Sequence, residues 1–514
     1  MNKKKIYLSK VFREDKDKFK NEMMNYYYTS YPEWCCKKYD KIMFDDIKPY
    51  EFVKPIQKLK DYYESSKSTY YKELYDNISE YEKHTDVIVK NNKYIDQMII
   101  EYCKCRKNIS IITLWPKAKM TKKYKDKLLK LLNDNGNVYY IKEITLSYRG
   151  AQSLLYQLYS DSKRMKNMSS INYKIERVGW ENNKNSKFTV IVYEHMGKNN
   201  IRGSSVSFKE QIRNIWLKDE KINNSMNENS KPRQYDYAHI NDYYYQTVEY
   251  AQIYFNENSL KFLDSQLLDR YLNLQNRFKS SYIQLNTYKN ILLMNFDPID
   301  QIRSLIYSSA VLYTYGLRLF DDIDGMFLYL DKSDTENFDK KIDLFFKNDN
   351  TMIPFTDIAM EGTEGWEKYW EEYLVKLSKL CKIQNFNEII LNPDYHYYYN
   401  GIKFITLRLD IIKRLIRLRP NAYVDIIAIN NLLGCKIYLP EILKNIPYYQ
   451  NDIDIDKFLN IIKKGLWYRY HINIDIKDIK KYISNKKITT GTTYCLSNQK
   501  CIDEFIEDFD ELMK

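Results

Sequence analysis

Histidine is rare in this chain of 514 residues, with 5 copies, and none of the 8 cysteines belongs to a Cys-x-x-Cys pair. A structural zinc site is therefore not expected, because such sites are built from closely spaced cysteine and histidine ligands. No apolar run approaches the roughly 18 residues of a membrane-spanning helix, so we expect no membrane contact. No secretory signal is recognisable either, and we expect a reducing compartment with free thiols.

Glycine and proline are also scarce, whereas tyrosine reaches 51 copies and lysine, asparagine and isoleucine are abundant. This skew is typical of an AT-rich genome, so a single tyrosine carries little functional information. The formal net charge of +13 favours a polyanionic partner such as nucleic acid, although lysine enrichment from base composition alone would also produce it. A chain of this length exceeds one hydrophobic core, and we expect two to four domains.

The most informative stretch is Tyr307–Tyr329, which reads YSSAVLYTYGLRLFDDIDGMFLY. Its apolar end, Met326–Tyr329, predicts a buried strand that Asp322 and Asp324 open. Alternate side chains of a strand share a face, so the two carboxylates lie together while Ile323 enters the core. They repel each other unless a cation lies between them, and Mg²⁺ or Mn²⁺ is the natural occupant. The alternative, a solvated acidic turn, fits poorly with the apolar strand that follows.

Ser308 and Ser309 precede the acidic pair by the length of a short helix. The arrangement resembles nucleotidyltransferases of the DNA polymerase β class, in which a strand ends in Gly-Ser, a helix follows and Asp-x-Asp comes next. Ser308 stands where that class has glycine. The resemblance implies that Ser308, Ser309 and the helix start hold the nucleotide phosphates, while Asp322 and Asp324 hold two metal ions.

The resemblance also implies a third carboxylate, on a neighbouring strand that faces the 3′-hydroxyl of the primer. The stretch Met352–Met360, MIPFTDIAM, predicts such a strand, and Asp357 lies on it. Glu361 is the alternative. The second Asp-x-Asp of the chain, within Asp452–Asp456, precedes a predicted helix at 457–464, where acidic residues stabilise the helix dipole. We interpret that second motif as helix capping.

The stretch from Tyr307 to Ile429 resembles, more specifically, the poly(A) polymerase catalytic subunit of large cytoplasmic DNA viruses, of giant-virus (mimivirus) and poxvirus type. Three segments carry the resemblance: YSS…DDID, FTDIAMEG, and YYYNGIKFITLRLDIIKRLIRLRPNAYVDIIAI. It implies template-independent addition of AMP from ATP to mRNA 3′ ends, with Mg²⁺ or Mn²⁺. It also implies a location in the viral factory of the host cytoplasm, or in the virion.

Two other functions remain open at this point: a non-catalytic RNA-binding or assembly protein on the same fold, and a terminal transferase that uses another nucleotide. The partners that the resemblance suggests are the RNA 3′ end and ATP. Poxvirus relatives rely on a partner subunit, so a second copy of this chain or a processivity subunit of the cap-methyltransferase kind is a further expected partner.

The N-terminal half repeats the order of elements around Tyr307–Leu330. It predicts, in order, a strand Val138–Leu146, a turn Ser147–Gly150, a helix Ala151–Tyr159 and strands Tyr173–Val178 and Phe188–Tyr193. Thr189, Val190 and Ile191 stand where the acidic pair would lie. We interpret this segment as a degenerate nucleotidyltransferase-like half, and an unrelated α/β domain is the alternative. Candidate RNA contacts in it are Arg149, Lys174 and Arg177.

Two basic helices are further RNA candidates. The predicted helix Asp410–Arg417, which Pro420 should end, carries Lys413, Arg414 and Arg417. A lysine-rich helix within 117–130 carries Lys122, Lys123 and Lys127. Each helix either binds phosphates or presents a solvated face. His239 is predicted to be a surface or capping residue rather than a ligand.

The fold class expected is α+β, with two nucleotidyltransferase-like domains of which the second is catalytic. We predict a helical N-terminal region at 1–130, the degenerate domain at 131–285, the catalytic domain at 286–435 and a helical C-terminal region at 436–514. A polar linker is expected at 219–238.

Overall fold

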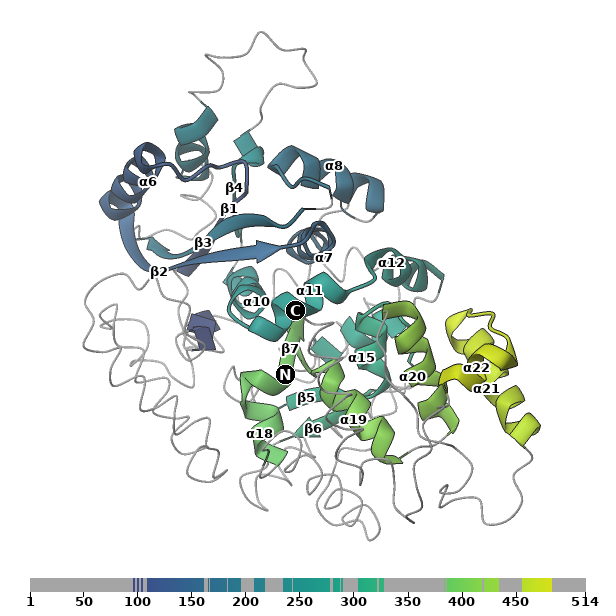
Figure 1. Cartoon of the computed structure of the whole chain (residues 1–514). Coiled ribbons are helices and arrows are strands. Elements are labelled where there is room, and N and C mark those ends of the chain that lie inside the picture. The colour runs from purple at the N-terminus through teal and green to yellow at the C-terminus, as the bar shows by residue number, and fades with distance from the viewer. Residues whose placement is uncertain are drawn as a thin grey trace, which may run out of the picture. The chain divides into compact units, whose positions relative to one another are not determined.

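The computed structural model describes residues 96–97, 99–100, 103–104, 109–160, 165, 167–182, 184–195, 208–217, 234–242, 244–277, 281–286, 288–289, 304–320, 323–327, 383, 386–417, 420–433 and 455–482. The chain divides into two compact units, one made of 1–260 with 289–302 and the other of 261–288 with 303–514. Each unit combines helices with one four-stranded sheet, so the expected α+β class is confirmed (Figure 1). No helix in the described ranges is both long and apolar enough to cross a membrane.

The sheet of the first unit is antiparallel throughout and has the strand order β2-β3-β1-β4. Its strands are β1 (Ile109–Leu114), β2 (Gly136–Leu146), β3 (Ser186–His195) and β4 (Ala238–Ile240). All six side chains of β1 are buried, because helices cover both faces of the sheet. β1 is absent from the sequence predictions, although its β-branched residues favour a strand. The predictions for β2 and β3 are confirmed.

One face of this sheet packs against α6 (Lys122–Asn135) and a helix at 208–217. Leu128 and Leu132 of α6 are buried there against Ile112 and Ile191. The other face is covered by α7 (Tyr148–Leu158) and α10 (Tyr244–Tyr254), as Figure 1 shows. Alternation along the strands explains the two layers, because neighbouring residues of a strand point to opposite faces.

The predicted strand Tyr173–Val178 is wrong, because these residues belong to the helix α8 (Met168–Val178). Asn167 caps its start by accepting a hydrogen bond of 2.9 Å from the Ser170 N–H. Gly179 ends it with φ +94°. Ile171, Ile175 and Val178 are all buried at helical spacing, and this period is visible only in a window that begins before Tyr173.

Two other predictions in this unit also need correction. The turn predicted at Ser147–Gly150 is the first turn of α7, with Ser147 as its N-cap. The predicted linker ends in regular structure, because η3 (Gln234–Asp236) and β4 occupy its last residues; its residues 219–233 lie outside the described ranges. α11 (Glu257–Ser265) contains the division between the two units.

The sheet of the second unit is mixed and has the strand order β6-β5-β8-β7. Its strands are β5 (Ser304–Tyr307), β6 (Asp324–Phe327), β7 (His396–Tyr399) and β8 (Ile402–Ile405). β5 pairs antiparallel with β6 and parallel with β8, so it is a central strand. Asn400 and Gly401, both with positive φ, form the tight turn between β7 and β8. β7 and β8 therefore form a hairpin.

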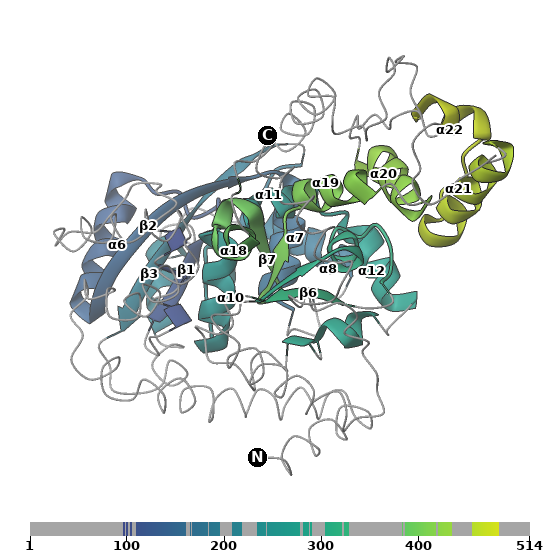
Figure 2. The ribbon, with the colours of Figure 1, turned by 90° about the horizontal axis from the view of Figure 1, so that it is seen from below.

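Among the described residues of this unit, the helices include α12 (Leu268–Arg277), α15 (Ser309–Thr314), α18 (Phe386–Leu391), α19 (Leu407–Arg417), α20 (Pro420–Leu433), α21 (Ile455–Tyr470) and α22 (Ile476–Tyr482), with η4 (Pro393–Tyr395). α19 confirms the predicted basic helix. Pro420 begins α20, a first-turn position at which the missing N–H of proline costs nothing. The helix predicted at 457–464 is confirmed within α21. Figure 2 shows α19, α20 and α21 following one another in the green to yellow part of the chain.

Candidate functional site

The structure brings the Ser308 turn and Asp324 to the same edge of the second sheet. β5 ends at Tyr307, and the turn begins with the next residue. Tyr307 is paired across the antiparallel ladder with Asp324, the first residue of β6. Ile323 is fully buried and Asp324 partly exposed, as the alternation of a strand requires. The serine turn and one of the predicted metal ligands therefore lie beside each other.

Ser308 adopts a backbone conformation that favours glycine, with φ +68° and ψ −132°. Residues other than glycine rarely occupy this region, and doing so costs on the order of 1–3 kcal/mol. The predicted resemblance to the polymerase β class expects a glycine at this position, and Ser308 adopts the backbone conformation that a glycine would supply. α15 begins directly afterwards, with the Val311 N–H donating to the Ser308 carbonyl at 3.2 Å.

Asp410 holds this turn from α19. Its Oδ1 accepts a hydrogen bond of 2.9 Å from the backbone N–H of Ser308, and its side chain is fully buried. Oδ2 accepts from Nε of Arg414 at 2.9 Å, one helical turn further along α19. Sequence reasoning missed Asp410, because the bond joins residues far apart in the chain. The one sequence signal for this role was that Asp410 is a carboxylate in the first turn of a predicted helix.

Arg414 continues the chain of charges to α20 and α21. It also forms an ion pair with Asp425, which lies 3.2 Å (Oδ1) from Nε of Arg318. The Tyr470 hydroxyl donates to the same Asp425 oxygen at 2.5 Å. Burial alone would raise the pKa of Asp425, but Arg318 and Arg414 outweigh it and the pKa is lowered. These buried ion pairs and hydrogen bonds connect the Ser308 turn at the start of α15 with α19, α20 and α21.

The three predicted RNA contacts on α19 therefore have different surroundings. Arg414 is buried between two carboxylates, so its guanidinium stabilises the unit. Lys413 is partly exposed, and its Nζ lies 3.5 Å from the ring centroid of Tyr307, next to the Ser308 turn. The side chain of Arg417 is outside the described part. RNA binding by this helix stays a prediction. Its candidate contacts are now Lys413 and Arg417, without the buried Arg414.

Asp322, Asp357 and Glu361 lie outside the described residues, as do Asp452 and Asp454. Ser309 lies within them and is buried at the start of α15. Among the residues that are described, no group of three or more histidine, cysteine or acidic side chains is placed to hold a metal ion. The metal site thus stays a prediction. Of its predicted carboxylate ligands, Asp324 lies within the described residues.

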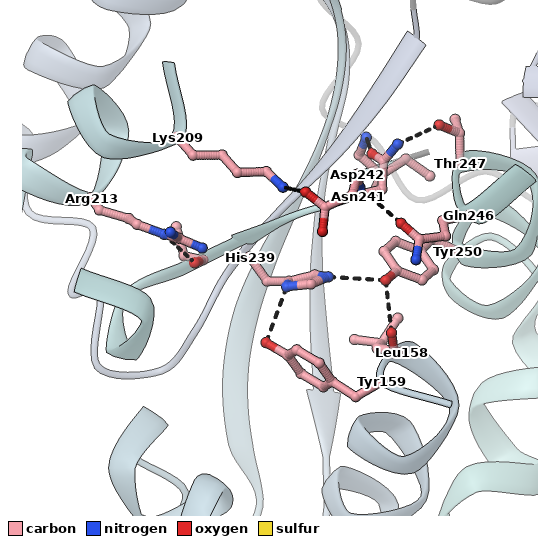
Figure 3. Close-up of polar contacts among 12 residues, drawn as sticks. Leu158, Tyr159, Lys209, Arg213, His239, Asn241, Asp242, Gln246, Thr247 and Tyr250 are labelled. Carbon is pink, nitrogen blue, oxygen red and sulfur yellow. Dashed lines mark hydrogen bonds and ion pairs between the residues drawn. The ribbon is translucent and has the colours of Figure 1, made fainter. Parts of the chain in front are cut away.

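A second polar cluster surrounds His239 in the first unit (Figure 3). His239 is buried on β4, which contradicts the predicted surface position. Its Nδ1 lies 3.0 Å from the Tyr159 hydroxyl and its Nε2 lies 2.9 Å from the Tyr250 hydroxyl. The Tyr250 hydroxyl donates to the Leu158 carbonyl at 2.9 Å, so its oxygen accepts from Nε2–H. Nδ1 then accepts from Tyr159, and the ring is a neutral Nε2–H tautomer.

Burial and nearby cations keep this histidine neutral. Burial lowers the pKa of His239 well below its usual 6.5, and Lys209, Arg213 and Lys174 lower it further. Lys209 forms an ion pair with Asp242, and Nε of Arg213 donates to the Ala238 carbonyl at 3.1 Å. Buried between two tyrosines, His239 has the contacts of a core residue and stabilises the packing of α7 and α10 on the sheet.

The predicted RNA contacts of the first unit also differ from one another. Nζ of Lys174 donates to the Tyr235 carbonyl at 2.7 Å, and Arg177 binds Asp236 at 2.6 Å. Both therefore fix the segment before β4. Arg149 is exposed on α7, and the lysines of α6, Lys122, Lys123 and Lys127, are exposed as well.

The comparisons with protein-family models, curated proteins and solved structures give no match for this chain.

Proposed function

We propose that this chain is a template-independent nucleotidyltransferase that adds AMP from ATP to the 3′ ends of mRNA, as a viral poly(A) polymerase does. The observation that supports this proposal most is the juxtaposition of the Ser308 turn with Asp324 across the Tyr307 pair. A glycine-type turn between a strand and a helix, beside a carboxylate on the neighbouring strand, is what the polymerase β resemblance requires. The second unit would then be the catalytic domain.

The carboxylates of this site fit hard cations, which take oxygen ligands. Asp322 and Asp324 would hold two Mg²⁺ or Mn²⁺ ions, with Asp357, or Glu361 in its place, as a third ligand to one of them. When bound, the ions would activate the RNA 3′-hydroxyl and neutralise charge on the departing pyrophosphate.

The chain's own groups would position the substrates. Ser308 and Ser309 would orient the triphosphate at the start of α15. The backbone N–H of Ser308 is bonded to Asp410, so this N–H fixes the turn and is not offered to phosphate. Lys413 lies beside Tyr307, where an ammonium group would favour either the triphosphate or the RNA backbone. An RNA 3′ end and ATP would thus meet at the β5–β6 edge.

The first unit would serve as a scaffold or RNA platform. A strand that leads through a serine into a helix also occurs there, at Leu146–Ser147, and supports its interpretation as a degenerate half. The polymerase would act in the viral factory of the host cytoplasm or in the virion. A second copy, or a processivity subunit of the cap-methyltransferase kind, remains a proposed partner.

The test is incubation of the purified chain with a short labelled RNA, Mg²⁺ or Mn²⁺ and each of the four nucleoside triphosphates in turn. We expect the RNA to be extended with ATP and hardly with the others. Extension with UTP or CTP instead would identify a terminal transferase of different selectivity. RNA binding without extension under any condition would favour the non-catalytic RNA-binding protein.

A further inference from the structure

α21 presents two different faces, and one of them is firmly packed. Leu459, Ile462 and Leu466 are buried on the inner face. A Cβ atom on Gly465 would come within 2.8 Å of Cγ2 of Val424, so α21 and α20 are in close contact at this glycine. Figures 1 and 2 both show the two helices side by side. The position of α21 on the second unit is therefore fixed by its inner face.

Hydrogen bonds at the end of α21 reinforce this packing. The Tyr470 hydroxyl donates to Asp425, and the Tyr470 carbonyl accepts from Arg270 at 3.1 Å. His471 then ends the helix with φ +54°, its N–H donating to the Trp467 carbonyl at 3.0 Å. Because the inner face and the terminus hold the helix, the side chains of the outer face are not required to anchor it.

The outer face carries two neighbouring aromatic residues that are mostly in water. Trp467 is 59% exposed and Tyr468 is 83% exposed. Lys464 and His471 are exposed as well, and their spacing places all four on one side of the helix. Single exposed apolar residues are common on protein surfaces. Two adjacent aromatic rings beside an exposed lysine, on a helix that is anchored elsewhere, indicate a binding surface.

The charge of α21 decides which partner fits. Its sequence contains Lys457, Lys463, Lys464 and Arg469 against the single carboxylate of Asp456. Asp452 and Asp454 precede the start of the helix, at the end opposite to Trp467 and Tyr468. Beyond its other end, Oδ1 of Asp475 lies 3.9 Å from Nζ of Lys463. A cationic helix with exposed aromatic rings suits a polyanion that has flat, unpaired bases, because each base has a face for stacking. An acidic or apolar protein surface would use only one of these two properties.

We propose that Trp467 and Tyr468, flanked by Lys464 and His471, form a stacking platform for single-stranded RNA. Bases would stack on the two rings, and Lys464 would contact the adjoining phosphates, with little preference for sequence. The platform lies on α21, away in sequence from every residue of the proposed nucleotide site. It requires that the chain binds RNA and does not require that the chain polymerises.

The experiment measures, by fluorescence anisotropy, how tightly the full chain binds a fluorescein-labelled single-stranded RNA. The RNA is about 12 nucleotides long, which is within the site sizes of known single-strand binders. Nucleotides and divalent ions are left out. The double variant Trp467→Ala/Tyr468→Ala should bind about 100-fold more weakly, since it removes two stacked bases and each contributes a factor on the order of 10. Trp467→Phe, which keeps a stacking ring, should lose about 2-fold. Lys464→Ala should reduce the salt slope by about 0.7, the share of one phosphate on a single strand.

The matched control is Tyr173→Ala, which removes an aromatic ring of 53% exposure from α8 in the first unit. It should leave the affinity unchanged, and circular dichroism and Tm should match wild type in every variant. Wild-type affinity in the double variant, an equal loss in Tyr173→Ala, or no RNA binding by the wild-type chain would each overturn the platform. A double variant that loses self-association but keeps its RNA affinity would show that a second copy covers this face. A chain that binds RNA through these residues but adds no nucleotide would leave the platform standing and reject the polymerase.

Discussion

The two units use a serine at the same structural junction in opposite ways. In the first unit, Ser147 follows β2 with an ordinary φ of −67°, and its hydroxyl caps α7 by accepting from the Gly150 N–H at 3.0 Å. In the second unit, Ser308 follows β5 with φ +68° and gives α15 no side-chain cap. Its backbone N–H is bonded to Asp410 instead. The first junction stabilises a helix, whereas the second holds a strained turn in place.

The strands opposite these junctions differ in the same sense. Leu146, the residue before Ser147, pairs with Ser186 at the start of β3. Tyr307, the residue before Ser308, pairs with Asp324 at the start of β6. Equivalent ladder positions therefore carry a serine in one unit and a carboxylate in the other. Strain and charge coincide in the second unit, and such coincidence is typical of functional sites.

The largest expected effect separates these two ladder positions. Asp324→Ala should reduce nucleotide addition by about 10³-fold or more, because metal-held charge stabilisation supplies several kcal/mol of the barrier reduction. Ser186→Ala, its counterpart in the first unit, should leave the rate unchanged. Primer extension with labelled RNA and ATP measures both, and circular dichroism checks the fold.

The acidic motif within Asp452–Asp456 provides a further control. Asp452→Ala should be nearly silent if this motif caps α21, and Asp322→Ala should behave as Asp324→Ala does. Normal tailing by the Asp324 variant would remove it from the site, and an inactive Asp452 variant would transfer the site to the other Asp-x-Asp.

The second contrast concerns how each unit satisfies its buried polar groups. Asp425→Ala leaves Arg318 and Arg414 buried without their shared carboxylate. Breaking a buried ion pair costs about 3–5 kcal/mol, so we expect the free energy of unfolding to fall by that amount. His239→Gln, which replaces neutral hydrogen bonds in the first unit, should cost about 1–3 kcal/mol. Urea unfolding followed by fluorescence gives both values, and an equal loss in the two variants would contradict the distinction.

The third effect is the pH dependence that His239 gives to the first unit. Because the folded-state pKa of His239 is lowered, the unfolded chain binds one more proton once the pH falls below about 6.5, the ordinary value of histidine. Stability is then fully present above that pH and declines on acidification towards the lowered pKa, by at most about 1.4 kcal/mol per pH unit. Tm between pH 8 and pH 5, measured for wild type and His239→Gln, isolates this contribution. Parallel curves for the two proteins would show that His239 does not cause it.

Periodic patterns and local motifs were predictable from the sequence, and contacts between distant segments were not. The apolar spacing of α6 and the alternation around Ile323 follow from neighbouring residues, so those elements were predicted correctly. Asp410 was missed because its partner, the Ser308 N–H, lies 102 residues away in the chain. Arg414 was interpreted as a surface cation because nothing local shows that Asp425 lies next to it.

The misread segments have equally specific causes. Tyr173–Val178 alternates over a window too short to reveal its helical period. His239 lies in a segment that is polar by composition, and its burial depends on the pairing of β4 with β1 and on contacts with Tyr159 and Tyr250, which lie outside that segment. The predicted acidic position of the first unit, Thr189–Ile191, lies inside β3, because the pairing of Leu146 with Ser186 could not be read from the sequence.

The smallest expected effect is the sharpest test of the two junctions, because it predicts opposite signs for one substitution. Ser308→Gly should raise the free energy of unfolding by about 1 kcal/mol, since glycine adopts the φ of +68° without the cost that a side chain incurs there. Ser147→Gly should lower it by a few tenths of a kcal/mol, because glycine is a tolerable N-cap that has no hydroxyl. Both substitutions change the side chain little, so the two variants can be compared by urea unfolding under identical conditions.

If both substitutions destabilise the chain, the Ser308 side chain makes a contact that outweighs the relief of strain. If Ser308→Gly stabilises the chain and also retains nucleotide addition, the Ser308 hydroxyl is not needed by the substrate, and Ser309 becomes the serine that contacts the triphosphate.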